Sequence, residues 1–200
     1  MYTMQLELPG PGIPLILERP MSHQEFEAFC LANPELQIER EPDGKLTITS
    51  PVSFISGERE NEIAAELLFY AREHGGRALS SSTGFRLPDG AVRSPDASYV
   101  TEDQMERFTQ EDLKYFLAVV PVFIAEILSP TDRLDAAKEK MQTAWIGNGV
   151  KLAWLVDADH DRLWVYRADG SVELVSPLDR VIGGEDVMPG FEFNLKWFKK

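Results

Sequence analysis

The pattern of apolar and polar positions is clearest over residues 122–128, an apolar run that contains a single carboxylate. Side chains alternate between the two faces of a strand, so Ile124 and Glu126 share one face while Phe123 lies on the other. Because both faces are apolar, the run predicts a strand over residues 121–128 in the middle of a sheet. An unpaired buried carboxylate costs several kcal/mol or takes up a proton. The pattern therefore indicates a cation, a metal ion or hydrogen-bond donors beside Glu126.

Two amphipathic helices are predicted before this strand. Ser22 and Glu25 form a capping box that begins a helix over about residues 22–32. Ser56 caps a longer helix that runs to about His74, where two glycines end it. The apolar positions of this longer helix have helical spacing and are assigned to the core; they are Ile63, Leu67, Leu68 and Ala71.

The remaining elements follow from alternation, turn residues and charge pattern. Paired strands are predicted over residues 36–40 and 45–49, 77–87 and 91–100, and 151–157 and 162–166. Further strands are expected over residues 170–175 and from residue 187, where a final edge segment starts. Surface helices are predicted within residues 101–116, and a helix over 132–148 follows the central strand. The chain is interpreted as one α/β domain over residues 1–200, with residues 1–20 as a flexible, Pro- and Gly-rich arm.

Composition narrows the function classes. The 20 basic and 33 acidic residues give a formal net charge of −13, which argues against loose, non-specific binding to nucleic acid. A local basic groove or a metal ion that bridges acids to phosphate stays compatible with this charge. No window approaches the roughly 18 apolar residues of a membrane span, and the N-terminus has no secretory pattern. Because Cys30 is the one cysteine, no intramolecular disulfide can form, and a cytoplasmic location is expected.

Three charged residues could form a reactive site. Asp96 begins a strand-like run directly after a proline, and Lys140 lies on the helix after the strand of Glu126. If the two strands are neighbours, the two acids meet at one end of the sheet, where they repel each other unless a cation lies between them. Oxygen ligands favour Mg²⁺ or Mn²⁺, which keep several waters and recruit phosphate. A lysine beside such an ion can orient a water or stabilise charge on a phosphoryl oxygen.

The motifs around these residues, in order, are Ser94-Pro95-Asp96, residues 126–133, Lys140-Met141, residues 148–150 and residues 154–157. Together with residues 82–88 and 184–191, this series resembles a large bacterial family of predicted endonucleases in the PD-(D/E)XK restriction-endonuclease-like superfamily. The likeness covers roughly residues 35–195. It implies a restriction-endonuclease-like fold with a central mixed β-sheet flanked by helices, a magnesium site and cleavage of DNA.

The resemblance assigns a role to each candidate in turn. Asp96 matches the motif aspartate and Glu126 the second acid, and both would bind the metal. The superfamily usually has a lysine two residues after the second acid, but Leu128 occupies that position here. The family takes its lysine from the following helix, which points to Lys140.

Two further assignments from the resemblance stay open. One residue is inserted near Trp145 relative to the family pattern, which makes Lys138 the alternative to Lys140. Superfamily members often use a glutamate from an early helix, for which Glu62 is the candidate and Glu58 its rival.

Several of these residues also have a purely structural interpretation. Asp96 could be a strand-start acid, and Glu126 could face solvent at a sheet end. Arg86 and Arg93 flank the turn that leads to Asp96, where they could hold a phosphate or be surface charges on a strand. The four tryptophans are interpreted as core or interface aromatics; they are Trp145, Trp154, Trp164 and Trp197.

Three functions are compatible with this pattern. The first is a magnesium- or manganese-dependent endonuclease that hydrolyses DNA phosphodiester bonds, expected to be a homodimer because two active sites can cut two strands. The second is a binding or assembly module that kept the nuclease fold without activity, which the acidic net charge and Leu128 favour. The third is a hydrolase of small phosphate esters, which a narrow pocket in place of an open cleft would favour.

Overall fold

The computed structural model describes residues 15–199, and its centre is a six-stranded mixed sheet. In chain order its strands are β4 (Arg77–Ser80), β7 (Ala97–Val100), β8 (Phe123–Ile127), β9 (Leu152–Asp157), β10 (Arg162–Arg167) and β11 (Val172–Val175). Their order in the sheet is β11-β10-β9-β8-β7-β4, in which β8 and β9 are parallel and the other pairs are antiparallel. The predicted central strand is therefore confirmed as β8.

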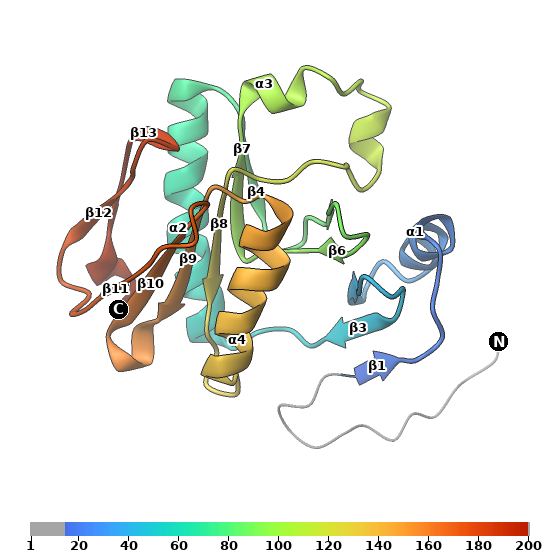
Figure 1. The fold of residues 1–200 in the computed structure, drawn as a ribbon, viewed down its shortest axis with the longest axis horizontal. Coiled ribbons are helices and arrows are strands. Elements are labelled where there is room, and N and C mark those ends of the chain that lie inside the picture. The colour runs from blue at the N-terminus through green and yellow to red at the C-terminus, as the bar shows by residue number, and fades with distance from the viewer. Residues whose placement is uncertain (1–14, 200) are drawn as a thin grey trace.

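Helices cover both faces of this sheet (Figure 1). On one face lies α2 (Phe54–His74), whose buried Ile63 and Leu67 belong to the same apolar cluster as Phe123 of β8. The other face is covered by α4 (Leu134–Lys140), which continues as a π-helical turn (Met141–Trp145) and a 3-10 turn (Ile146–Asn148). The alternation along β8 thus divides its side chains between two cores, as the sequence pattern predicted.

A second, five-stranded sheet lies beside the central one (Figure 1). Its order is β1-β3-β2-β6-β5, formed by β1 (Leu15–Leu17), β2 (Gln37–Arg40), β3 (Leu46–Thr49), β5 (Phe85–Arg86) and β6 (Val92–Arg93). Against it packs α1 (His23–Ala32), which begins with the predicted capping box of Ser22 and Glu25. The predicted hairpin of residues 36–49 is confirmed as β2 and β3.

The long hairpin predicted over residues 77–100 is divided between the two sheets, so the expectation of two continuous strands is wrong. Its outer parts, β4 and β7, pair in the central sheet, while its inner parts, β5 and β6, pair in the second sheet. A turn in which the Thr83 N–H donates to the Ser80 carbonyl ends β4. Pro95 separates β6 from β7, because a residue without an N–H cannot continue the ladder.

Two helix starts also differ from the prediction. The hydroxyl of Ser53 accepts the N–H of Ser56, so α2 begins three residues earlier than expected. Downstream, α4 begins at Leu134 without a side-chain cap. Gly149 has φ +107°, a left-handed conformation that favours glycine, and ends this helical segment as predicted. Residues 101–116 contain the short α3 (Glu102–Met105) and a 3-10 turn (Asp112–Lys114).

The C-terminal segment packs on the α2 side of the central sheet. Instead of one more edge segment, it forms a separate antiparallel ribbon of β12 (Val181–Gly184) and β13 (Met188–Asn194), followed by a 3-10 turn (Leu195–Lys199). Arg59 of α2 fixes this turn, because its Nε donates to the Phe198 carbonyl at 2.9 Å and its Nη2 contacts Asp159 at 2.7 Å.

Two expectations concern the extent of the chain. Residues 1–14 of the predicted N-terminal arm lie outside the described residues, and residues 15–17 form β1. The division into one domain stays a prediction. Within residues 15–199, no helix has both the length and the apolar content that a membrane span requires.

Replacement of Arg59 by methionine is expected to destabilise the protein by about 2 kcal/mol, because the Phe198 carbonyl and Asp159 lose a buried donor. Urea unfolding of the variant measures this. Arg72→Met, on an exposed position of the same helix, should change stability by less than about 0.5 kcal/mol. Equal unfolding midpoints for the two variants would contradict the anchoring role of Arg59.

Candidate active site

The two predicted acids lie opposite each other on neighbouring strands. In the antiparallel pair of β7 and β8, Ala97 is opposite Ala125, so the same register continued by one residue places Asp96 opposite Glu126. Opposite residues of an antiparallel pair point to the same face. The Ile127 N–H donates to Asp96 Oδ2 at 2.6 Å, which fixes the aspartate at the end of the strand pair.

Glu126 has a cation and a neutral donor beside it. Its side chain is 15% exposed, and its Oε1 accepts from Lys140 Nζ at 2.9 Å and from Trp145 Nε1 at 2.7 Å. The lysine and the tryptophan both come from the helical segment that covers this face of β8. Asp96, Glu126 and Lys140 thus lie together, although each belongs to a different element.

The charges of these groups depend on one another. Burial, the charge of Glu126 and the charge of Glu60 raise the pKa of Asp96 well above its usual range, against the Ile127 N–H and Lys140, which lower it. Burial lowers the pKa of Lys140, but the carboxylates of Glu126, Glu39 and Asp96 outweigh burial and raise it above its ordinary value. Lys140 is therefore an ammonium at neutral pH, and Asp96 binds a proton more readily than an exposed aspartate does.

Glu60 is a carboxylate near this site that the sequence interpretation missed. Burial and the charge of Glu126 raise its pKa, while a hydrogen bond with the Ser81 side chain lowers it. Glu60 precedes Ile63 by three residues and so continues the stripe of α2 that faces the sheet. Helical spacing alone could have identified it.

Glu62 and Glu58, the two glutamates predicted from the resemblance, lie on other sides of α2 than Glu60 does. Glu58 is exposed, and Glu62 is half-buried. Each is two residues from Glu60, which is about 200° around the helix axis, so neither side chain leaves the helix in the direction of Glu60.

Lys138, the alternative lysine, lies away from the acids. Its ammonium is 4.4 Å from the centre of the Trp164 ring, in the geometry of a cation–π contact. Lys138 and Lys140 are about 200° apart around the helix axis. The lysine that contacts Glu126 is therefore Lys140.

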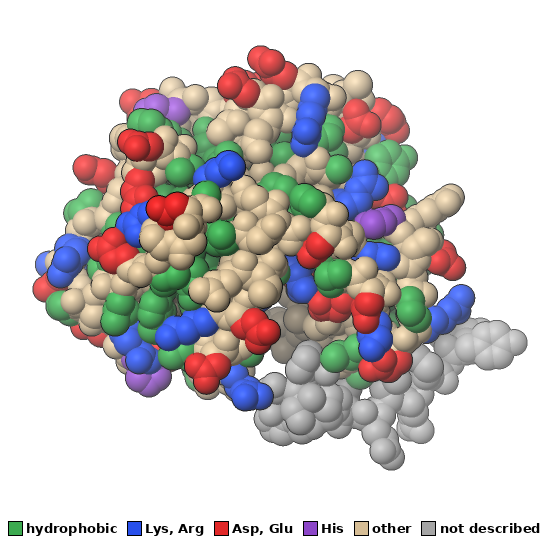
Figure 2. All heavy atoms as spheres, in the orientation of Figure 1, with side chains coloured by type: hydrophobic (Ala, Val, Ile, Leu, Met, Phe, Trp, Pro, Cys, Tyr) green, Lys and Arg blue, Asp and Glu red, His purple; other side chains and the backbone are tan. Residues whose placement is uncertain are grey.

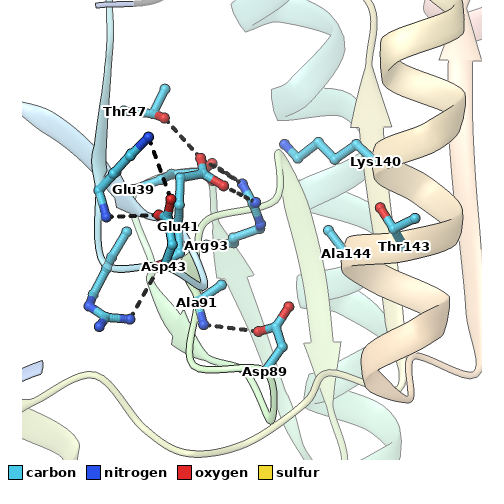
Figure 3. Close-up of polar contacts among 12 residues, drawn as sticks. Glu39, Glu41, Asp43, Thr47, Asp89, Ala91, Arg93, Lys140, Thr143 and Ala144 are labelled. Carbon is cyan, nitrogen blue, oxygen red and sulfur yellow. Dashed lines mark hydrogen bonds and ion pairs between the residues drawn. The ribbon is translucent and has the colours of Figure 1, made fainter. Parts of the chain in front are cut away.

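Arg93 does not have the surface position that the sequence suggested. Its side chain is 12% exposed and forms ion pairs with Glu39 at 3.0 Å and with Glu41 (Figure 3). Burial lowers the pKa of Arg93, but the two carboxylates outweigh burial, so the pKa lies above its ordinary value. A guanidinium that is paired with two carboxylates has less capacity left for a phosphate, and a phosphate contact by Arg93 stays a prediction.

Arg86 is half-buried, and a phosphate contact by this residue stays a prediction.

A hydrogen bond of Glu39 joins the second sheet to the site. Glu39 of β2 also accepts the Ser94 N–H at 2.8 Å, two residues before Asp96. Figure 3 shows the Lys140 side chain extending from α4 toward the group of Glu39, Glu41 and Arg93. The position of Asp96 is therefore set by β8 on one side and by the second sheet on the other.

The donor set fits a hard divalent cation. The neighbouring oxygens belong to Asp96 and Glu126, and the single positive charge of Lys140 stands against these two carboxylates. Within residues 15–199, no group of three or more His, Cys, Asp or Glu side chains is arranged to hold a metal ion. Two carboxylates with water and substrate phosphate are a usual way of binding Mg²⁺, so these residues are compatible with that ion.

Comparison with known proteins supports this assignment of the fold. A solved structure described as a "putative nuclease belonging to DUF820", from Anabaena variabilis, superposes with a TM-score of 0.71. It is 18% identical in sequence, and the match covers 90% of this chain and 97% of that chain. The likeness confirms the predicted restriction-endonuclease-like fold, a mixed sheet flanked by helices.

Among curated proteins, no significant match to the chain is found. The family named Uma2, described as "Putative restriction endonuclease", matches residues 23–196, which is most of the chain. This protein therefore belongs to the Uma2 family of putative restriction endonucleases.

Proposed function

We propose that this protein is a metal-dependent endonuclease that hydrolyses phosphodiester bonds in DNA. The observation that carries the proposal is the meeting of Asp96, Glu126 and Lys140 at one end of β7 and β8. Membership of a family described as restriction endonucleases supports a nuclease in general. Metal dependence and DNA as the substrate are the parts of the proposal that go beyond the general assignment as a nuclease.

Asp96 and Glu126 would hold Mg²⁺ or Mn²⁺ through carboxylate oxygens. When bound, such an ion supplies Lewis-acid polarisation of a phosphoryl oxygen. Lys140 stays charged because the surrounding carboxylates raise its pKa, so it acts as an electrostatic donor to a phosphoryl oxygen or an attacking water rather than as a base. The Ile127 N–H orients Asp96.

Surface charge limits how DNA would be bound. The visible face in Figure 2 intersperses acidic and basic side chains, and the formal net charge of the chain is −13. Because non-specific affinity for DNA depends on neutralised phosphates, affinity would come from local contacts and from the metal ion between the acids and a phosphate. The predicted homodimer and the cytoplasmic location stay predictions.

The acidic net charge of −13 favours an inactive module, but the site itself gives the two alternatives less support than it gives a nuclease. A hydrolase of small phosphate esters would use an enclosed pocket, but two surface hollows of the described residues, of about 430 and 310 Å³, contain neither Asp96 nor Glu126. An inactive module was suggested by Leu128, but Lys140 from the next helix places an ammonium on Glu126 instead.

Glu126→Gln is expected to abolish binding of Mg²⁺ and Mn²⁺, because it removes the charge of one of the two acids. Calorimetry on the intact protein should show micromolar-to-millimolar binding that the variant lacks, and supercoiled plasmid should be cut by the intact protein alone. Glu58→Gln, on an exposed position of α2, is the control and should bind metal normally. Unchanged binding by Glu126→Gln would place the metal elsewhere and refute the proposed site.

Lys140→Met is expected to lower the cleavage rate about 100-fold or more, the effect of removing one donor to developing charge. Initial rates of plasmid cleavage at saturating Mg²⁺ measure this. Lys138→Met removes an ammonium from the same helix but only one that lies on Trp164, and it should keep the rate within a few-fold. A larger loss in Lys138→Met than in Lys140→Met would exchange their roles.

Asp96→Asn is expected to stabilise the metal-free protein at neutral pH. Because folding raises the pKa of Asp96, the folded state binds the proton more tightly than the unfolded state. The contribution of Asp96 to stability is therefore fully present below its unfolded pKa, about 4, and is lost as pH rises through the folded pKa. Thermal melts between pH 4 and pH 8 without metal should show a Tm gain for Asp96→Asn that grows with pH.

The control for this comparison is Asp186→Asn, at an exposed position, whose Tm should follow that of the intact protein across the pH range. Mg²⁺ should raise the Tm of the intact protein more than that of Asp96→Asn. If the Tm difference between Asp96→Asn and the intact protein did not depend on pH, folding would not raise the pKa of Asp96, and this prediction would be wrong.

A further inference from the structure

Trp145 differs from an ordinary core tryptophan in what its indole N–H contacts. The side chain is fully buried, yet its Nε1 donates to Glu126 Oε1 at 2.7 Å. The same oxygen accepts from Lys140 Nζ at 2.9 Å. The two donors thus occupy both lone pairs of one carboxylate oxygen.

Both of these contacts are made by Oε1, and neither uses Oε2, the second oxygen of Glu126. We propose that Trp145 is a positioning residue that fixes the rotation of the Glu126 carboxylate, so that Oε2 is presented to the divalent cation. This inference rests on the proposed function, and it assigns to a buried aromatic residue the orientation of a metal ligand.

The helix geometry around Trp145 supports this role. The Ile146 N–H is shared between the carbonyls of Met141 and Gln142, and the Val150 N–H donates to the Trp145 carbonyl five residues back. In a regular α-helix, Lys140 and Trp145 would be about 140° apart around the axis. In a π-helical turn, residues five apart are separated by about one turn, so both side chains can reach Glu126.

A structural need for the ring alone does not explain the hydrogen bond. Trp154 is also fully buried, and its Nε1 has no hydrogen-bond partner within the described residues. Within the described residues, the Trp154 ring is therefore buried without a protein acceptor for its indole N–H. Trp154 lies opposite Ala125 in the β8–β9 register and packs in the α2-side core, so its ring is close to the site but faces away from Glu126.

The matched test compares Trp145→Phe with Trp154→Phe, each of which removes an indole N–H and keeps an aromatic ring. Calorimetry with Mg²⁺ and with Mn²⁺ should show affinity weakened roughly 10-fold or more in Trp145→Phe, the usual effect of losing a hydrogen-bond partner of a metal ligand. Trp154→Phe should bind with nearly unchanged affinity. Equal metal affinities of the intact protein and Trp145→Phe would overturn the inference and leave the proposed function standing.

A second readout uses the intact protein and needs no activity. In ¹H–¹⁵N spectra of ¹⁵N-labelled protein, the indole signal of Trp145 is assigned by its absence from Trp145→Phe, or by its change of chemical shift in Glu126→Gln if Trp145→Phe does not fold. Added Mg²⁺ should shift this signal and leave the Trp154 signal in place. A Trp145 signal that does not move while the metal binds overturns the inference. Absence of any Mg²⁺ or Mn²⁺ binding by the intact protein overturns both the inference and the proposed function.

Discussion

The ion pair between Lys140 and Glu126 is the interaction on which the rest of the site depends. A carboxylate on a central strand can stay charged only if a cation compensates for the lost hydration. Lys140 provides that cation from the neighbouring helix, at 2.9 Å. Lys140 can make this contact because α4 passes over β8 near Glu126. The π-helical turn that follows α4 still packs on the sheet, since its Met141 and Trp145 belong to the core on this face.

Electrostatics near the acids is shared between the two sheets. Lys140 faces the carboxylates of Glu126, Asp96 and Glu39, so one ammonium is set against several negative charges. Arg93 offsets Glu39 and Glu41 in turn, at a position that is nearly buried. The result is a region in which negative charge is in excess, where a divalent cation is bound more readily than an additional anion.

The sequence was most informative where a pattern was local and strong. The alternation around Glu126 predicted a central strand and a partner for its carboxylate, and the resemblance to the endonuclease family pointed to Lys140, with Lys138 as the alternative. Similarly, the Ser22 capping box marked the start of α1, because its hydrogen bonds join residues only three apart.

Other features depended on contacts that the sequence pattern does not contain. The alternation of residues 77–100 is the same whether its strands join one sheet or two, so the division at Pro95 could be read only from tertiary pairing. The π-helical turn leaves the spacing of apolar residues nearly unchanged, so the sequence pattern could not predict that the Trp145 indole points toward Glu126. Glu60 was different, since its place on the stripe of Ile63 and Leu67 was available from periodicity.

The hairpin that passes through both sheets has a consequence for how such a protein can evolve. β6 and β7 are consecutive parts of one chain segment, and Asp96 directly follows the point where the chain leaves the second sheet. The second sheet is consequently not a module that can be exchanged without displacing an acid of the site. A lineage that reshapes this sheet therefore also moves Asp96, so the sheet and the candidate site have to change together.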